Sequence, residues 1–257
     1  MSDTPSIKIV VASHKPYWMP NDPMYIPMQV GAVRQEYIPG FQHDDVGDNI
    51  SAKNPRYCEL TALYWAWKNV DADYIGLAHY RRHFAGSGER GVLTSDEAIE
   101  LVAHNPVILP KKRHYFIDTV GDHYAHTFDA SHIDVLRDSL TRLSPATLPV
   151  FEKHMSSRSA HIWNMCIMRK DIFDAWCSWL FKILDDSEHS INFDGMTPFE
   201  ERAIGRLSER LLDPWLVEND ISFAECTVKA AERTNWPKKI LSFLRAKFAG
   251  KKYDRSF

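Results

Sequence analysis

The stretch Asp73–Phe84 reads DYIGLAHYRRHF, and it passes from a largely apolar run directly into two adjacent arginines. The run Tyr74–Ala78 suits a strand that is covered on both faces, and such strands in α/β proteins carry functional groups at their carboxyl ends. Arg81 and Arg82 would then lie at a site where paired guanidinium hydrogen bonds hold a phosphate or a carboxylate. The alternative is that both arginines follow an edge strand and lie on the surface without a ligand.

Composition limits the classes of protein to which the chain can belong. Of its 257 residues 44% are hydrophobic, which is enough for the core of one large α/β domain. The formal net charge of -3 lacks the basic balance typical of nucleic-acid binders. No stretch has the pattern of a signal peptide or a transmembrane helix, so we expect a cytoplasmic protein. Its four cysteines are widely spaced, which favours reduced thiols over disulfides or a zinc site.

Strand and helix patterns alternate along the chain, which favours an α/β sheet. Apolar runs predict further strands at Ile7–Ala12, Val107–Leu109 and His161–Met168. Capping residues predict helices that begin at Asn54, at Thr94–Glu97 and at Asp171. Helical spacing predicts three more, at Ser131–Leu143, Pro149–Met155 and Phe199–Trp215.

The first expected strand also ends in polar residues, since Ser13, His14 and Lys15 follow its apolar run. This repeats the pattern at Arg81 and Arg82, with polar groups at the carboxyl end of a strand.

A second kind of anion site is the amino end of a helix. The helix expected from Asn54 begins with an N-cap residue, and Pro55 takes its first position. Its free amides, with Asn49 and Lys53 just before them, could receive an anion from a ligand. The alternative is that Asn54 only caps the helix.

Some polar residues within predicted elements allow two interpretations. Asn164 lies in the middle of the strand expected at His161–Met168, where its amide either bonds neighbouring backbone or contacts an acceptor.

His123 and His126 are three residues apart, but neither carboxylates nor a second ligand pair are evident nearby. We therefore interpret them as loop histidines and predict no metal site there.

The helix expected at Phe199–Trp215 carries charged residues on the side away from its apolar face. These are Arg202, Arg206, Glu209 and Arg210, at spacings that bring them near one another. They form either a solvated ion-pair face or part of a site.

The character of the chain changes at Lys229. Lysines and arginines alternate there with tryptophan, phenylalanine and leucine, which predicts a basic amphipathic helix that rests on an anionic membrane surface. The alternative is a packed terminal helix with a solvated basic face. We therefore expect one domain at residues 1–228 and a tail at residues 229–257.

Five segments resemble a bacterial family of capsular and exopolysaccharide (including O-antigen) biosynthesis proteins, long filed as a domain of unknown function and now grouped with sugar transferases. The resemblance extends from Ile9 to about Leu216. Each segment alone is weakly specific, but five in one order are quite specific. They are VVASHK with the later YIPMQVG, DNISAKNPRYCELTALYWAWKN, YIGLAHYRRHF, NMCIMRKDIFDAWCSWLFKIL and RAIGRLSERLL.

The resemblance implies a glycosyltransferase with a GT-A-like, Rossmann-like nucleotide-sugar-binding domain and a mixed sheet. Some relatives are galactofuranosyltransferases that use UDP-galactofuranose. In such folds a later strand usually ends in an Asp-x-Asp metal motif, whereas here the comparable strand ends in His79-Tyr80-Arg81. That departure puts a dependence on Mn²⁺ or Mg²⁺ in doubt, and arginines would neutralise the diphosphate instead.

The resulting hypothesis is transfer of a sugar, with inversion, from a nucleotide diphosphate to a hydroxyl of a growing glycan that is anchored in lipid. Asp194 is the first choice for the general base because a loop carboxylate is placed freely, and Glu209 is the second. The expected donor-site residues are Ser13, His14, Lys15, Asp48, Asn49, Lys53, Asn54, His79, Arg81 and Arg82. The expected acceptor-site residues are Asn164, Arg202 and Arg210.

Two other functions compete with this one. The same residues could serve a carbohydrate-binding or scaffold subunit of a polysaccharide assembly complex that catalyses no reaction. A phosphate-ester hydrolase is less favoured because no nucleophile motif, P-loop or dense carboxylate cluster is present. Peripheral attachment to the inner face of the membrane through the tail would suit any of these functions.

Overall fold

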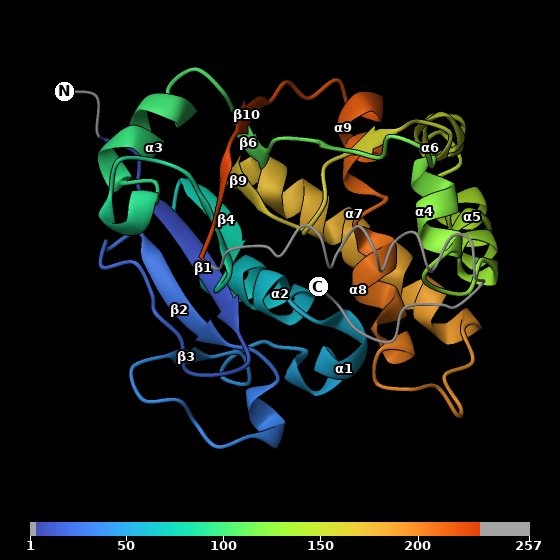
Figure 1. Ribbon diagram of the computed structural model, residues 1–257, viewed down its shortest axis with the longest axis horizontal. Coiled ribbons are helices and arrows are strands. Elements are labelled where there is room, and N and C mark those ends of the chain that lie inside the picture. The colour runs from blue at the N-terminus through green and yellow to red at the C-terminus, as the bar shows by residue number, and fades with distance from the viewer. Residues whose placement is uncertain (1–3, 232–257) are drawn as a thin grey trace.

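The computed structural model describes residues 4–231, which fold into a mixed α/β structure around one sheet (Figure 1). The sheet follows the order β10-β6-β9-β4-β1-β2-β3. Off this path, β5 pairs with both β4 and β11. Its strands are β1 (Ile7–Ser13), β2 (Tyr25–Gln29), β3 (Gln42–His43), β4 (Tyr74–His79), β5 (Arg82–Phe84), β6 (Val107–Pro110), β9 (Cys166–Arg169), β10 (Ala224–Cys226) and β11 (Val228–Ala230). A separate small sheet pairs β7 (Arg113–His114) with β8 (Ser159–Ala160).

Within the described residues the large sheet is mixed, with four parallel strand pairs and four antiparallel ones. β1 runs parallel to β2 and β4, whereas β9 is antiparallel to both of its neighbours, β4 and β6. The approach of β4 to β9 is close, because a Cβ at Gly76 would lie 2.6 Å from the carbonyl oxygen of Cys166. Glycine is therefore the residue that lets these two central strands pair.

The sheet is covered by helices on both faces, as Figure 1 shows for α3 on one side and α2 with α7 on the other. Val10 and Leu77 pack into the larger core with α2 and α7, whereas Ile9 and Ala78 pack against α3. This alternation follows from the two-residue period of a strand. Both faces are thus apolar, as the run Tyr74–Ala78 predicts.

The helices differ widely in length, from four residues in α1 to 21 in α7. The capping box expected at Thr94–Glu97 is confirmed, with both of its hydrogen bonds present at the start of α3. The helices are α1 (Asn54–Tyr57), α2 (Leu60–Asn69), α3 (Ser95–Val102), α4 (Val120–Ala125), α5 (Ser131–Leu143), α6 (Leu148–Met155), α7 (Lys170–Ser190), α8 (Ala203–Ser208) and α9 (Leu212–Glu218).

Two helix starts differ from the prediction. Asn54 lies inside α1, and its side-chain amide donates to the carbonyl of Cys58 at 2.8 Å instead of capping the helix. α7 begins at Lys170, so Asp171 lies in its first turn and pairs with Arg169.

Two longer elements are broken where the sequence predicted continuity. The expected strand His161–Met168 is strand only from Cys166, because the chain turns at Trp163 and Asn164. The expected helix Phe199–Trp215 divides into a 3-10 turn at Glu200–Arg202 followed by α8 and α9.

The basic tail expected at residues 229–257 lies almost entirely outside the described residues, which end with the residue after β11. Within residues 4–231, no helix has the combination of length and apolar character that crossing a bilayer requires.

Candidate functional site

The two strand ends singled out in the sequence lie next to each other. β1 and β4 are parallel neighbours with Ala12 opposite His79, so the residues that follow both strands emerge at one edge of the sheet. The backbone N–H of Tyr80 donates to the carbonyl of Ala12 at 3.1 Å. Burial, followed by the positive charges of Lys15, Arg81 and Arg202, lowers the pKa of His14 below its ordinary value. The structure therefore brings both predicted groups together.

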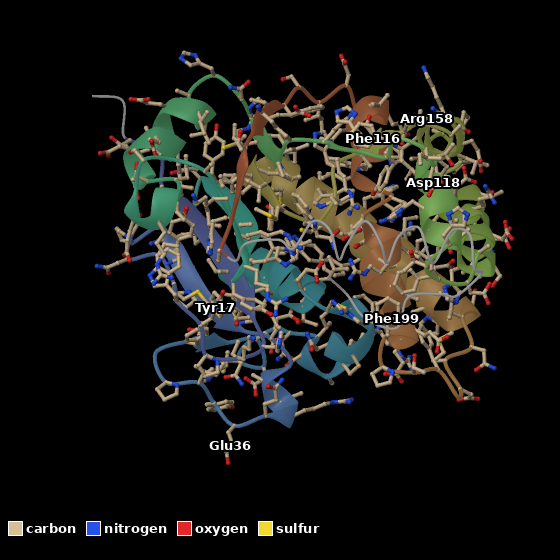
Figure 2. All side chains as sticks on the ribbon, in the orientation of Figure 1. Tyr17, Glu36, Phe116, Asp118, Arg158 and Phe199 are labelled. Carbon is tan, nitrogen blue, oxygen red and sulfur yellow. The ribbon has the colours of Figure 1, made fainter. Side chains whose placement is uncertain are left out.

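Aromatic side chains surround these strand ends. Tyr17, labelled in Figure 2, packs edge-on against Tyr80 with ring centroids 4.9 Å apart. The ammonium of Lys15 lies 5.6 Å from the Tyr80 ring. The guanidinium of Arg82 lies 5.0 Å from the Trp163 ring, a distance at which cation and ring attract. These contacts hold the cationic side chains against flat surfaces and limit their freedom.

α8 and the residues around it add further charges to the same edge. Glu209 binds Arg210 at 2.7 Å and Arg206 at 3.4 Å, and its Oε1 also accepts the Trp163 N–H. The side chains of Glu209 and Arg210 are only 6% and 5% exposed. The interpretation of these residues as a solvated ion-pair face is therefore wrong for this pair, because burial removes it from water.

The ionisation of Glu209 follows from its neighbours. Burial opposes its negative charge, but the guanidinium groups of Arg206 and Arg210 outweigh burial and lower the pKa of Glu209. Burial also lowers the pKa of Arg82, and this effect is opposed by the charges of Glu209 and Glu59. Both carboxylates therefore share one electrostatic environment with the arginines of the strand end.

Asn164 is held by three hydrogen bonds. Its amide donates to Glu59 Oε1 at 2.8 Å and to the carbonyl of Gly205 at 3.2 Å. Its side-chain oxygen accepts the hydroxyl of Ser208 at 2.9 Å. The ring of His79 makes a hydrogen bond with the carbonyl of Trp163, the residue just before Asn164. Asn164 and His79 therefore fix the turn that lies between the strand ends and α8.

The same turn is anchored from the other side by a buried contact between a histidine and a carboxylate. His161 Nδ1 lies 2.5 Å from Asp213, and the backbone N–H of His161 donates to the same carboxylate at 2.9 Å. Burial opposes the charge of Asp213, but its hydrogen bond with His161 and the neighbouring charges lower its pKa to about 2. The turn at Trp163 is thus tied to α9 as well as to α8.

We call this set of residues the strand-end cluster. Its cations outnumber its carboxylates, and they come from segments far apart in the sequence. Its members are Lys15, Glu59, Arg81, Arg82, Arg202, Arg206, Glu209 and Arg210.

The strand-end cluster suits an anion better than a metal ion. β4 ends with His79, and the guanidinium groups of Arg81 and Arg82 follow it; guanidinium does not ligate a cation. In the described part of the chain, no three or more His, Cys, Asp or Glu side chains are grouped so that they could hold an ion. The His123 ring lies tilted against that of Tyr115, with centroids 4.5 Å apart, and burial with the charge of Arg210 lowers the pKa of His123 to about 3.

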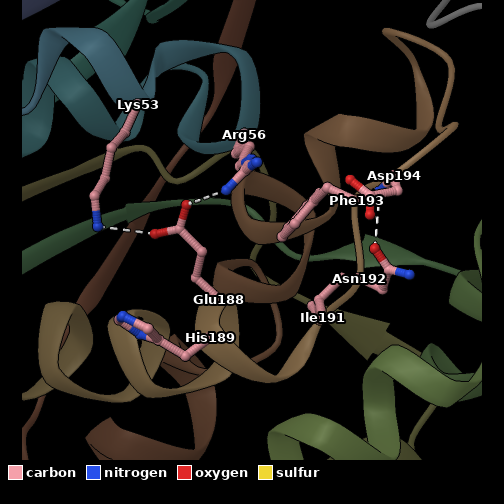
Figure 3. A pocket seen from close by; sticks show the side chains of 8 residues that line it. All are labelled: Lys53, Arg56, Glu188, His189, Ile191, Asn192, Phe193 and Asp194. Atoms are coloured by element: carbon pink, nitrogen blue, oxygen red, sulfur yellow. Dashed lines mark hydrogen bonds and ion pairs between the residues drawn. The ribbon is translucent and has the colours of Figure 1, made fainter.

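Several predicted site residues lie elsewhere. Lys53 binds Asp185 at 3.0 Å and Glu188 at 2.8 Å, and Arg56 also binds Glu188. Lys53, Arg56 and Glu188 line a pocket of about 440 Å³ together with His189 and Ile191–Asp194 (Figure 3). No described contact joins Lys53 or Asp194 to the strand-end cluster.

Asp194 belongs to the exposed loop after α7. The backbone N–H of Asp194 donates to the side-chain oxygen of Asn192 at 2.9 Å. Figure 3 shows Asp194 beyond Phe193, whereas Lys53 and Arg56 both reach Glu188.

The remaining predicted donor residues stabilise the segment before α2. Asp48 accepts the hydroxyl of Tyr64 at 3.2 Å. Asn49 donates to the carbonyls of Asp45 and Gly47, and Asn54 donates to that of Cys58. These bonds shape the loop and its helix, so their use as ligand contacts stays a prediction.

A match to a family model places the chain among known proteins. The model described as "Domain of unknown function (DUF4422)" matches residues 8–220. The chain belongs to this family. No curated protein matches it.

This DUF4422 chain is also similar to a solved structure, described as an apo structure of the bifunctional glycosyltransferase WbbM. The TM-score is 0.81 and the sequence identity is 30%. The match covers 89% of this chain and 46% of that one, so the chain spans less than half of that protein. The predicted fold class, a mixed α/β domain of the glycosyltransferase GT-A-like kind, is confirmed.

Sequence reasoning missed two members of this site in the DUF4422 chain. Glu59 follows the short α1, and its neighbours carry the aromatic spacing of a helix, which gives no sign of a site there. At Trp163 the apolar pattern predicts the interior of a strand, whereas the guanidinium of Arg82 lies 5.0 Å from its ring. A charged residue inside the aromatic stretch from Tyr57 to Trp67 is a signal that could have drawn attention to Glu59.

Proposed function

We propose that this chain is a glycosyltransferase that binds the diphosphate of a nucleotide-linked sugar at the strand-end cluster. The observation that carries the proposal is the grouping of Arg81, Arg82 and Arg206 at the carboxyl edge of β1 and β4, in a fold similar to that of a glycosyltransferase. Ligands of open α/β sheets bind at this edge. Arginine pairs well with phosphate oxygens, and fixed cations stabilise the charge that develops on a leaving diphosphate.

The neighbouring groups have roles that follow from their positions. Ser13, His14 and Lys15 lie at the end of β1, next to the arginines, and would contact the base or ribose of the donor. Tyr17 and Tyr80 offer aromatic faces beside them. Lys53 is already paired with two carboxylates, so we leave it out of the diphosphate contact.

The reaction is transfer of a sugar to a hydroxyl group of a bacterial surface polysaccharide. UDP-galactofuranose is the proposed donor, and the acceptor is a glycan anchored in lipid. The hydroxyl oxygen attacks the anomeric carbon from the side opposite the diphosphate, so the configuration inverts. The bond to the diphosphate breaks, and the nucleoside diphosphate leaves with the electron pair while the arginines bind it.

Binding of nucleotides tests the proposal directly. Thermal unfolding would be followed with UDP, GDP, CMP and their sugar conjugates, each in EDTA and in Mn²⁺, for the wild type and for Arg82→Met and Lys53→Met. A ligand that binds only the folded state raises the melting temperature. We expect a selective rise that persists in EDTA, that Arg82→Met abolishes and that Lys53→Met retains. No rise with any nucleotide would contradict the proposal.

Turnover separates the enzyme from a binding subunit that uses the same residues. The wild type would be incubated with UDP-galactofuranose and with UDP-galactose, with octyl galactosides as acceptors, and glycosylated product would be measured by mass spectrometry. Product formation supports a transferase. Nucleotide binding without product or released UDP would support a carbohydrate-binding subunit instead.

A further inference from the structure

Glu59 lies at a break between two helices. α1 ends at Tyr57, and Cys58 has a φ of 53°, which lies in the left-handed region that residues with a side chain rarely adopt. α2 then begins at Leu60, so Glu59 occupies the position just before its first turn. Such a conformation costs free energy and persists only where the surrounding structure enforces it, often at functional sites.

A second strained segment meets Glu59 across the site. Two consecutive residues, Trp163 and Asn164, have φ values of 77° and 55°, respectively. The side-chain amide of Asn164 donates to Glu59 Oε1 at 2.8 Å. Gly205 of α8 packs closely against the first of these turns, since a Cβ at this position would lie 3.2 Å from the sulfur of Cys58. The two strained turns are therefore joined through the Glu59 carboxylate.

The two oxygens of Glu59 differ in their partners. Oε1 accepts from Asn164, whereas Oε2 makes no hydrogen bond to any other residue in the described range 4–231. Glu59 acts electrostatically on His79, Arg82 and Arg202, so its carboxylate lies among the cations of the strand-end cluster. One oxygen is thus held in place while the other is left to a ligand.

The other two carboxylates considered for this chemistry are less suited to it. Both oxygens of Glu209 are bound, Oε1 by Arg206 and the Trp163 N–H, and Oε2 by Arg210. A carboxylate held by two guanidinium groups accepts a proton poorly. Asp194 lies on an exposed loop without a described contact to the strand-end cluster.

We propose that Glu59 is the catalytic base of the transfer, with Asn164 as the residue that orients it; this inference rests on the proposed function. Glu59 Oε2 accepts the proton of the acceptor hydroxyl as its oxygen bonds to the anomeric carbon and the diphosphate leaves. Protonated Glu59 then releases its proton to water. Asn164 directs Oε2 towards the acceptor by holding Oε1.

The test compares Glu59→Gln with Asp194→Asn as a matched amide control. Glutamine retains the shape of Glu59 and can still accept from Asn164, but it cannot take up a proton. We expect kcat for transfer from UDP-galactofuranose to octyl galactosides to fall by about 100-fold or more in Glu59→Gln, the usual share of a general base. Asp194→Asn should keep wild-type turnover, and both variants should keep the wild-type dissociation constant for UDP.

The pH profile gives a readout that a structural role would not change. Wild-type kcat should decline at low pH as the base becomes protonated, and this decline should be absent from the residual activity of Glu59→Gln. Asn164→Ala should reduce kcat less than Glu59→Gln does and should keep the decline at low pH.

The outcomes separate this inference from the proposed function. If the wild type transfers sugar and Glu59→Gln does so at a similar rate, or if the variant loses UDP binding along with turnover, Glu59 is not the base. If the wild type neither binds nucleotide nor forms product, the proposed function is wrong and the inference is rejected with it.

Discussion

Replacing Glu209 with glutamine should destabilise the protein strongly, because the change removes one charge of a buried pair. Arg210 is 5% exposed, and its bond to Glu209 measures 2.7 Å. Its other described hydrogen bond goes to the carbonyl of Arg206 at 3.2 Å, which is uncharged. Glu209→Gln keeps the shape and one acceptor oxygen, but it removes the negative charge that compensates the buried guanidinium of Arg210.

The size of the loss follows from measured effects of breaking buried ion pairs. Removing one partner costs about 3–5 kcal/mol, and we expect the lower end, about 3 kcal/mol, because glutamine still accepts a hydrogen bond. For a domain of this size, that loss corresponds to a fall of about 6–12 °C in the melting temperature. The assay is urea unfolding at pH 7, followed by tryptophan fluorescence and circular dichroism.

A second substitution tests whether charge is the cause. Arg210→Met removes the cation that Glu209→Gln leaves unpaired, so the double variant should regain much of the lost free energy of unfolding. UDP should also stabilise Glu209→Gln more than it stabilises the wild type, because a bound diphosphate supplies negative charge. A loss below about 1 kcal/mol, the scale of an exposed pair, would refute the reasoning. So would a double variant as unstable as the sum of the single ones.

Two further changes test the packing and the buried histidines. Gly76→Ala should lower the free energy of unfolding in urea by about 1–3 kcal/mol, because its Cβ would lie 2.6 Å from the carbonyl of Cys166. Gly121→Ala, whose Cβ meets only ordinary contacts at 3.4 Å or more, is the control and should lose nothing. Burial lowers the pKa of His83 and of His154 from 6.5 to about 4, so the unfolded chain takes up protons first as the pH falls. Stability should therefore decline from about pH 6.5 to about pH 4, and a flat series of urea midpoints over this range would contradict this expectation.

The central sheet could be predicted because its signal is local. β1 and β4 are apolar runs followed abruptly by polar residues, and a strand buried on both faces has few other sequence patterns. Their adjacency brought Arg81 and Lys15 to one edge, as the shared pattern at the two strand ends suggested.

The rest of the site depends on contacts between distant segments. Lys53 was predicted to bind a diphosphate, but its ammonium binds Glu188, which is 135 residues away in the sequence. Cys58 and Asn164 have left-handed backbone conformations, but neither is a glycine, so the sequence gives no signal of these turns. The helical spacing around Cys58 therefore predicts one continuous helix, and the position of Glu59 at a break between two helices could not be predicted.

The contacts of Glu188 bear on how the loop after α7 is coupled to the proposed reaction centre. Its carboxylate binds Lys53, Arg56 and the hydroxyl of Tyr57, so α1 is fastened to the end of α7 just before the exposed loop 191–199 begins. That loop also contacts α1 directly, because the guanidinium carbon of Arg56 lies 4.0 Å from the Phe193 ring. A change that shifts Phe193 would therefore be transmitted through α1 to Glu59, so shortening the loop between Ile191 and Phe199 should lower turnover although the loop carries no residue of the proposed reaction.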